Sequence, residues 1–285
     1  MVEPEDLGAG LEPSPRNRVK VANEIADRLR RQIVTGQRVR GERLPTEKEL
    51  ARSFGVSQPT IREALRVLDV MGLVDIRHGS GAWIAGDSMQ LLSQSLETLL
   101  QLEGVGIGEI LEVRRALAGL SASQAARRAT AADIQSLREA QEAIDGGRGA
   151  SVLERASRIL RFLDALSAAA HNPLLFALES SLNKLLIQVQ LHAWEARSPK
   201  FWATWGEPAS TQRRGIVAAL AAKDEKLTLA AMEEYHKVQW ERLSADRALH
   251  RIRLSDPDIG GALAIEFLTA SPTQPTVDGL AGRPH

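Results

Sequence analysis

The 285-residue sequence contains no cysteine, and this absence excludes disulfide bonds, thiolate catalysis and cysteine-ligated zinc. It also contains no apolar run close to the ~18 residues that a membrane-spanning helix requires. Residues 1–17 lack the basic start and the apolar centre of a secretion signal. We therefore expect a cytoplasmic protein with no membrane partner.

The motifs of the common enzyme classes are absent as well. No serine lies in a nucleophile elbow with histidine and aspartate partners, and no glycine-rich loop has the spacing of a phosphate-binding site. We expect that the protein is not an enzyme.

The overall composition is that of a soluble globular protein of one large or two ordinary domains, with 44% hydrophobic and 25% charged residues. The net charge of zero conceals an asymmetry. Residues 16–86 carry 14 Lys and Arg against 8 Asp and Glu, or +6, so the remainder carries −6. A basic segment of this kind is typical of a DNA-binding module joined to another domain, although an uneven solvated surface explains it equally well.

Two short helices joined by a turn are predicted in the first third of the chain. Thr46 followed by Glu49 forms a capping box that begins the first helix, and Gly55 provides the left-handed residue that ends it. Ser57 then caps the second helix, whose first turn tolerates Pro59 because the missing N–H has no partner there. The pattern indicates a helix-turn-helix.

The second of these helices has an apolar face and a polar face. The apolar face, which we expect to be buried, consists of Ile61, Ala64, Leu65, Leu68 and Met71. Two β-prone runs, 73–76 and 82–84, follow and predict a hairpin with a glycine-containing tip. In such an arrangement the start of the helix contacts base edges, while cations and hydroxyls hold phosphates. The candidate DNA contacts are Lys48, Ser57, Gln58, Thr60, Arg62, Arg66, Arg77, His78 and Gly79.

Residues 18–86 resemble the GntR family of bacterial transcription regulators. The resemblance is carried by LPTEKELA, FGVSQPTIREAL, MGLV and IRHGSGAWI, in that order. It implies a winged helix-turn-helix that binds double-stranded operator DNA. Gln58 departs from the family pattern, in which an arginine contacts a guanine, and glutamine more naturally pairs with adenine.

The predicted fold class is mostly α, with a small β-hairpin in the first domain and an all-helical bundle in the second. The expected parts are a disordered tail (1–17), the winged helix-turn-helix domain (18–86), an all-helical effector-binding and dimerisation domain (87–250) and a flexible C-terminal tail (251–285). Within the second domain, helices are predicted at 89–102, 106–129, 131–145, 150–170, 173–196, 209–222 and 225–249.

The all-helical part is similar to the FCD effector domain that accompanies one branch of the GntR family. The motifs EILEVRRALAGLSASQAARRAT, FLDALSAAAHNPLL, RRGIVAALAAKD and AAMEEYH carry this resemblance through their order and spacing. Many FCD domains hold a divalent metal with one Asp and three His, and the aligned positions here are Ile159, Leu163, Arg213 and Tyr235. Because these side chains are poor metal ligands, we expect no metal and no other cofactor.

A rebuilt metal site is the alternative. It would draw on Asp164, His171, His192 and His236, but no two of these lie three or four residues apart on one helix. Surface or hydrogen-bonded histidines are therefore the simpler interpretation.

A pocket with an apolar wall and a cation would suit an organic acid, such as an acyl or aromatic carboxylate. Arg114 lies among apolar neighbours, and it points either to a ligand anion or to a structural partner such as Glu112 or Glu179. The candidate effector-binding residues are Arg114, Ile159, Leu163, Asn183, Gln188, Arg213 and Tyr235.

These features together predict a homodimeric, ligand-responsive transcription repressor that binds an inverted repeat and is released by a small organic carboxylate or acyl effector. The alternative is a constitutive DNA-binding repressor or architectural protein with a degenerate effector site.

Overall fold

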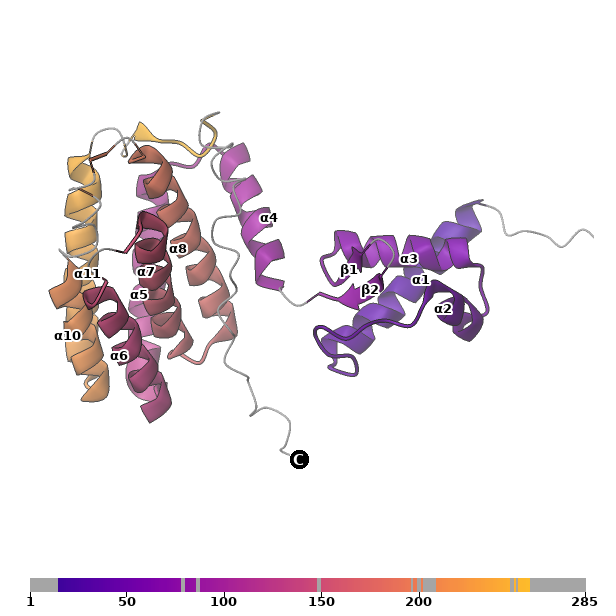
Figure 1. Ribbon diagram of the computed structural model, residues 1–285, viewed down its shortest axis with the longest axis horizontal. Coiled ribbons are helices and arrows are strands. Elements are labelled where there is room, and N and C mark those ends of the chain that lie inside the picture. The colour runs from indigo at the N-terminus through magenta and orange to yellow at the C-terminus, as the bar shows by residue number, and fades with distance from the viewer. Residues whose placement is uncertain are drawn as a thin grey trace, which may run out of the picture. The chain divides into compact units, whose positions relative to one another are not determined.

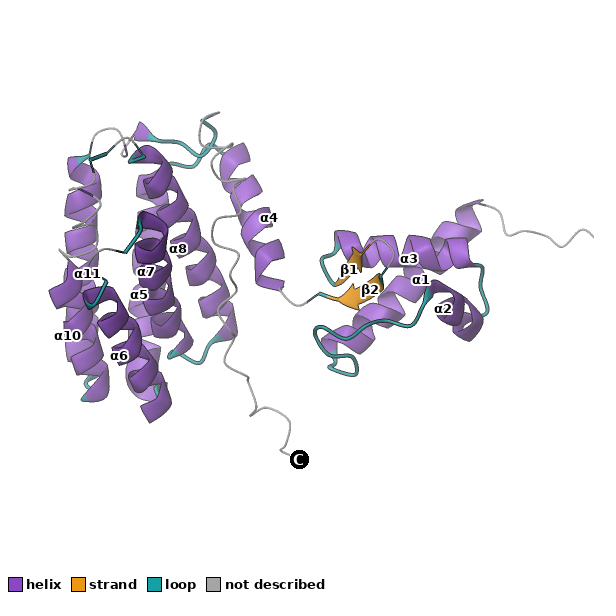
Figure 2. Cartoon of the chain, viewed as in Figure 1, coloured by secondary structure: helices purple, strands orange, loops and turns teal. Residues whose placement is uncertain are grey.

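The computed structural model describes residues 15–256 except 78–79, 86–87, 148–149, 196, 199–200, 202–208, 247–248 and 250. The chain forms two compact units, Met1–Leu91 and Leu92–His285. Helices dominate the described part of both units, and the paired strands lie in the first (Figure 2). The predicted fold class, mostly α with a small hairpin, is confirmed.

The described part of the first unit contains helices α1, α2 and α3 and a β-hairpin (Figure 1). Its elements are α1 (Pro15–Val34), α2 (Glu47–Phe54), α3 (Gln58–Val70), β1 (Val74–Arg77) and β2 (Gly81–Ile84). The strands are antiparallel, with Val74 opposite Ile84. Leu29 of α1 and Ile61 and Leu68 of α3 are fully buried in a shared core. The arrangement is that of a winged helix-turn-helix.

The two ends of α2 form as the sequence predicts. The hydroxyl of Thr46 accepts a hydrogen bond from the Glu49 amide at 3.3 Å, and the Glu49 carboxylate accepts one from the Thr46 amide at 2.8 Å. Gly55 ends the helix at φ 67°, a left-handed conformation that glycine adopts without strain. These contacts fix the turn between α2 and α3.

Three predictions about helix ends in this unit are wrong. Met71 is 43% exposed rather than buried, because it lies at the C-cap of α3, beyond its buried face. Ser57 occupies the N-cap of α3, but its hydroxyl hydrogen-bonds the hydroxyl of Thr60 at 2.9 Å instead of a helix amide. Helix α1 begins at Pro15, inside the predicted tail, because proline is well suited to a first helical turn; residues 1–14 lie outside the described residues.

Seven further described helices have bounds close to the predicted ones. They are α4 (Ser88–Leu102), α5 (Ile107–Arg128), α6 (Ala131–Asp145), α7 (Val152–Ala168), α8 (Pro173–Ala193), α10 (Ser210–Ala221) and α11 (Glu225–Ala245) (Figure 1). Four of them begin at a side chain that accepts a hydrogen bond from an amide of the first turn: Thr130, Ser151, Asn172 and Asp224. None of the described helices is long and apolar enough to cross a membrane.

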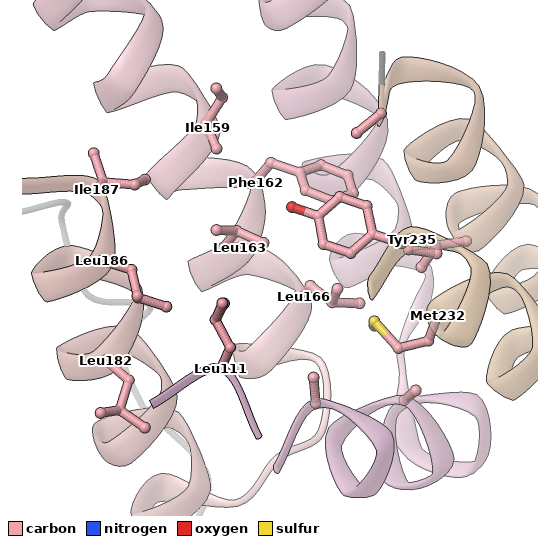
Figure 3. Packing of buried hydrophobic residues seen from close by; sticks show 14 of the residues in the cluster. Leu111, Ile159, Phe162, Leu163, Leu166, Leu182, Leu186, Ile187, Met232 and Tyr235 are labelled. Carbon is pink, nitrogen blue, oxygen red and sulfur yellow. The ribbon is translucent and has the colours of Figure 1, made fainter. Parts of the chain in front are cut away.

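The core of the second unit lies between α5, α7, α8 and α11, whose apolar side chains meet in one cluster (Figure 3). Phe162 of α7 is fully buried, and Leu111 of α5, Leu182 of α8 and Met232 of α11 are nearly so. Burial of each such side chain stabilises the fold by about 1.5–3 kcal/mol. This packing holds the surrounding helices at fixed positions.

After α11 the chain returns to the bundle. Leu254 is buried, and its amide donates to the carbonyl of Val105 at 3.0 Å. Nη1 of Arg253 donates to the carbonyl of Gly104 at 2.8 Å. The predicted flexible tail, 251–285, therefore starts with a docked segment. Its residues after 256 lie outside the described residues.

Candidate nucleic-acid interface and buried pocket

Most of the predicted DNA contacts lie on exposed surface of the first unit. Gln58 is the first residue of α3 and is exposed, and Arg62 and Arg66 are exposed further along this helix. Lys48 of α2 and Arg77 at the end of β1 are also exposed. Helix α3 therefore presents an amide at the end that a recognition helix directs at bases, followed by two cations that suit phosphates.

The arginines of this surface are held by neighbouring carboxylates. The exposed ion pairs are Arg62–Glu47 at 2.8 Å, Arg66–Glu63 at 3.5 Å and Arg77–Asp75 at 2.9 Å. Pairs of this exposure contribute little to stability, because solvent screens the two charges. A phosphate can therefore replace the carboxylate at small cost. Without DNA, the ion pair keeps each guanidinium close to the surface of the first unit.

Thr60 is not on the exposed face where it was predicted. It is only 4% exposed, on the buried face of α3 next to Ile61 and Ala64. Its hydroxyl bonds Ser57, so it stabilises the start of α3 and is not available for DNA in this conformation. The predicted contacts at 78–79 lie outside the described residues.

Arg43, which lies against strand β2 of the hairpin, was not among the predicted DNA contacts. The guanidinium groups of Arg43 and Arg77 lie 5.8 and 5.4 Å from the centroid of the Trp83 ring, a distance at which cation–π attraction operates. Arg43 also forms a β-bridge with Trp83. A single arginine in the loop before α2 carries no motif, and only the fold brings it to β2.

A small cavity lies in the second unit among α5, α7, α8, α10 and α11. Its volume is about 40 Å³. A cavity needs roughly 10–15 Å³ to hold a single water, so this one holds a few waters or a small organic molecule. Six of the seven predicted effector-binding residues line it: Arg114, Ile159, Leu163, Asn183, Arg213 and Tyr235.

Gln188 is the seventh predicted residue, and it does not line the cavity. Asn183, Leu186, Ile187 and Gln190 line it from α8 at relative positions 0, 3, 4 and 7, which is one face of a helix. Gln188 falls off that face. Gln190, which the sequence reasoning did not select, takes the place expected for it.

Two further polar side chains of the cavity come from α11. Tyr235, Gln239 and Arg242 are four and three residues apart, and all three line the cavity. Only Tyr235 was predicted from the sequence, although helical spacing from that residue indicates the other two.

Arg114 points into the bundle, as predicted. Its Nε donates a hydrogen bond to Oδ1 of Asn183, another residue that lines the cavity. Burial raises the pKa of Glu179, and hydrogen bonds from serines and the charge of Arg114 oppose that rise. Arg114 therefore interacts electrostatically with Glu179 and also lines a cavity, and its contact with a ligand anion stays a prediction.

Arg213 and Arg242 form the second cationic part of the cavity. Arg213 is 1% exposed, and its Nε donates to Oε1 of Gln141 at 2.9 Å. Burial lowers the pKa of both arginines, Tyr235 opposes that shift in both, and the charge of Arg213 lowers the pKa of Arg242 further. No Asp or Glu lines the cavity within the described part of the chain.

The four positions aligned with the FCD metal ligands meet at this cavity, but their chemistry does not fit a divalent metal. Ile159 and Leu163 supply alkyl groups, Arg213 a cation and Tyr235 a phenol, whereas zinc and nickel sites use imidazole or carboxylate. Across the described residues, no group of three or more His, Cys, Asp or Glu has the geometry to hold a metal ion.

The histidines considered for a rebuilt metal site have other surroundings. Nε2 of His171 lies 2.8 Å from Oδ2 of Asp133 on exposed surface. His192 is half-buried near the end of α8. His236 is buried, and burial, followed by the charges of Arg114 and Arg115, lowers its pKa to about 3. His236 is therefore neutral at physiological pH.

Comparisons with known proteins match both units. The model of the family described as bacterial regulatory proteins, gntR family, matches residues 21–84, and the model of the FCD domain matches residues 109–237. The chain is 30% identical over 240 residues to an uncharacterized HTH-type transcriptional regulator of Mycobacterium tuberculosis, covering 82% of this chain and 93% of that protein. It is 33% identical over 210 residues to the HTH-type transcriptional regulator LutR of Bacillus subtilis, covering 70% and 90%.

Similarity also extends to an operon regulator and to a solved structure. The chain is 29% identical over 231 residues to the Uxu operon transcriptional regulator of Escherichia coli, with 77% of this chain and 85% of that protein covered. A solved structure of Streptococcus agalactiae GntR superimposes with a TM-score of 0.58 at 24% identity, covering 78% of this chain and 98% of that one. This last similarity concerns the fold alone.

Proposed function

The chain belongs to the GntR family of bacterial regulatory proteins and carries an FCD domain, and from this premise we propose that it is a dimeric repressor released from DNA by a small organic acid. That it is a DNA-binding transcription regulator follows from the family. The effector, the repressor role and the dimer are the proposal.

The observation that carries the proposal is the composition of the cavity in the second unit. Arg114 and Arg213 are buried beside it, and Ile159 and Leu163 form part of an apolar wall. Each of these two arginines donates its Nε to a side-chain amide oxygen, of Asn183 and of Gln141, and a guanidinium has five N–H donors in a planar fork that matches a carboxylate. An organic acid supplies a carboxylate for the cations and a carbon skeleton for the wall, so its binding satisfies both parts of the cavity.

The same composition supports a sensor that works without a metal. The guanidinium groups would attract the carboxylate of the effector, as a metal ion does in other FCD domains. We also propose that the protein is not an enzyme, since its relatives are named as transcription regulators.

Helix α8 provides a physical route from the cavity to α4, the helix at which the second unit begins. Asn183 of α8 lines the cavity, and Ser181, two residues earlier, lies with its hydroxyl 2.9 Å from that of Ser93 in α4. An acid that favours one position of α8 therefore shifts the position of α4. Because α4 follows the DNA-binding unit in the chain, this shift changes the spacing of the two DNA-binding units of a dimer. Coupling of this kind changes an affinity by about 1–3 kcal/mol in typical allosteric proteins.

Fixed spacing explains why such a bias would release DNA. Two recognition helices of a dimer reach half-sites about 34 Å apart, or a multiple of that distance. A dimer that holds its two DNA-binding units at another spacing keeps only its sequence-independent phosphate contacts.

The test begins with selection of bound duplexes from a random pool, which yields an operator. Binding of the full chain to that operator is then measured with a panel of organic acids and with the corresponding neutral amides. We expect at least one acid to raise the melting temperature of the protein and to weaken operator binding, while its amide does neither.

The same experiment separates the constitutive alternative. A protein that binds its operator tightly but responds to no acid, in either melting temperature or affinity, would be a constitutive repressor with a degenerate pocket. A protein that binds no preferred duplex would contradict the proposal as a whole.

A further inference from the structure

We propose that the cavity binds a short dicarboxylate, with one carboxylate on Arg114 and the other on the pair Arg213 and Arg242. This inference rests on the proposed function, because it specifies the chemical class of the acid that acts there. It is carried by the number of cations, by their arrangement and by the size of the cavity.

The cations belong to two groups on different helices. Arg114 comes from α5 and is fixed to Asn183 of α8. Arg213 comes from α10, where its Nε is fixed to Gln141 of α6, and Arg242 comes from α11. Each guanidinium has a planar array of donors that matches a carboxylate. Arg213 and Arg242 lie close enough for the charge of Arg213 to lower the pKa of Arg242, whereas Arg114 is held at Asn183. The donors therefore form two groups, which suit a ligand with two acidic ends.

The charge balance also favours two negative charges. Arg114, Arg213 and Arg242 line the cavity, and no carboxylate lines it within the described part of the chain. Glu179 acts electrostatically on Arg114 and Asp145 acts on Arg213, but neither carboxylate lines the cavity, so a monocarboxylate would reach the donors of one group only. A second carboxylate gains a second set of charge-assisted hydrogen bonds, which are about twice as strong as neutral ones.

The size and the wall of the cavity restrict the body of the ligand. A volume of about 40 Å³ is too small for a long acyl chain in this conformation. Ile159, Leu163 and Leu186 give the cavity apolar surface, which an inorganic dianion would leave without a partner. A short carbon chain between two carboxylates fits both conditions, and an acyl thioester does not.

Isothermal titration of the full chain without DNA tests this inference. The probes are succinate and glutarate, the monocarboxylates butyrate and valerate with matched carbon numbers, and inorganic phosphate. We expect at least one dicarboxylate to bind once per chain and at least tenfold more tightly than its monocarboxylate, and phosphate to bind no better than the monocarboxylates.

Variants assign the second carboxylate to its cation. Arg242→Gln, at a partly exposed position, should reduce the affinity for the dicarboxylate to that of the monocarboxylate, and Arg242→Lys should recover only part of it because the planar fork is lost. Lys237→Gln removes the same charge from the exposed surface of α11 and is the matched control, which should bind as the wild type does. Circular dichroism verifies that each variant is folded.

The outcomes separate this inference from the proposed function. If the monocarboxylates bind as tightly as the dicarboxylates and Arg242→Gln changes nothing, the second carboxylate is refuted while an acid effector stands. Equal binding of phosphate would refute the carbon skeleton. If no acid of any kind binds, the inference and the acid-responsive function both fail.

Discussion

The guanidinium of Arg62, in α3, makes a two-point contact with the carboxylate of Glu47, the first residue of α2. Nε lies 3.2 Å from Oε1, and Nη2 lies 2.8 Å from Oε2. The contact joins the two helices of the helix-turn-helix and directs a cation along the surface of α3. It thus prepares Arg62 for a phosphate without burying it.

Replacement of this arginine tests its role on the DNA backbone. Arg62→Ala should weaken binding to operator and random duplexes alike, and it should reduce the slope of log K against log salt by about 1. Arg115→Ala is the matched control, because it removes a similarly exposed arginine paired with Glu233 in the second unit. A wild-type salt slope in Arg62→Ala would show that this side chain does not contact phosphate.

Gln58 is exposed at the first position of α3, and its substitution tests base readout. Gln58→Arg should move the preference at one operator position from adenine toward guanine, with about 1–3 kcal/mol of discrimination. Parallel selections from a random pool with the wild type and the variant measure this change. Identical selected sites would exclude Gln58 as a base reader.

The donor set of the cavity predicts the metal content of the purified protein. Because Ile159, Leu163, Arg213 and Tyr235 stand at the positions aligned with metal ligands, elemental analysis should find less than one divalent metal per chain after dialysis against a chelator. A full equivalent that survives chelation would overturn the assignment of a metal-free sensor.

The buried imidazole of His236 predicts how stability depends on pH. Its pKa falls from 6.5 to about 3 on folding, so its contribution to stability is complete above about pH 6.5 and is lost as the pH falls toward 3. Between pH 7.5 and pH 5, this residue alone should lower the free energy of unfolding by roughly 2 kcal/mol. In denaturant unfolding, the stability difference between wild type and His236→Gln should shrink by that amount at pH 5.

Asp164 is a control of opposite sign. Burial raises the pKa of this carboxyl to about 6 from 3.8, so the cost of its ionisation to the folded state is complete above about pH 6 and declines to zero as the pH falls toward 3.8. Asp164→Asn should therefore stabilise the protein at pH 7.5 and do so less at pH 5. If the stability differences of the His236 and Asp164 variants do not depend on pH, the two groups titrate normally.

Local rules predicted the helices well, because their ends are set by neighbouring residues. The capping box of Thr46 and Glu49 and the left-handed Gly55 need only a few residues of context. The prediction of the cavity residues depended instead on the resemblance to the FCD domain. That resemblance indicated Arg213 and Tyr235 although they lie apart in the sequence.

The errors arose where tertiary contacts decide. Thr60 has a hydroxyl side chain of the kind that contacts DNA, but the rotation of α3 against α1 places it on the buried face. Gln188 and Gln190 are residues of the same type, and only the packing of α8 decides that Gln190 lines the cavity and Gln188 does not. Arg43 reaches Trp83 through a loop that no periodic pattern describes.

Acid-controlled operator binding is tested most directly by the ratio of affinities for the selected operator and a random duplex, measured by fluorescence anisotropy at moderate ionic strength with and without a short dicarboxylate. We expect a ratio of at least about 1,000 in the absence of acid. We also expect the acid to reduce this ratio sharply in the wild type and less in Arg242→Gln. A ratio near one without acid, or a high ratio that saturating, bound acid leaves unchanged, would contradict acid-controlled operator binding.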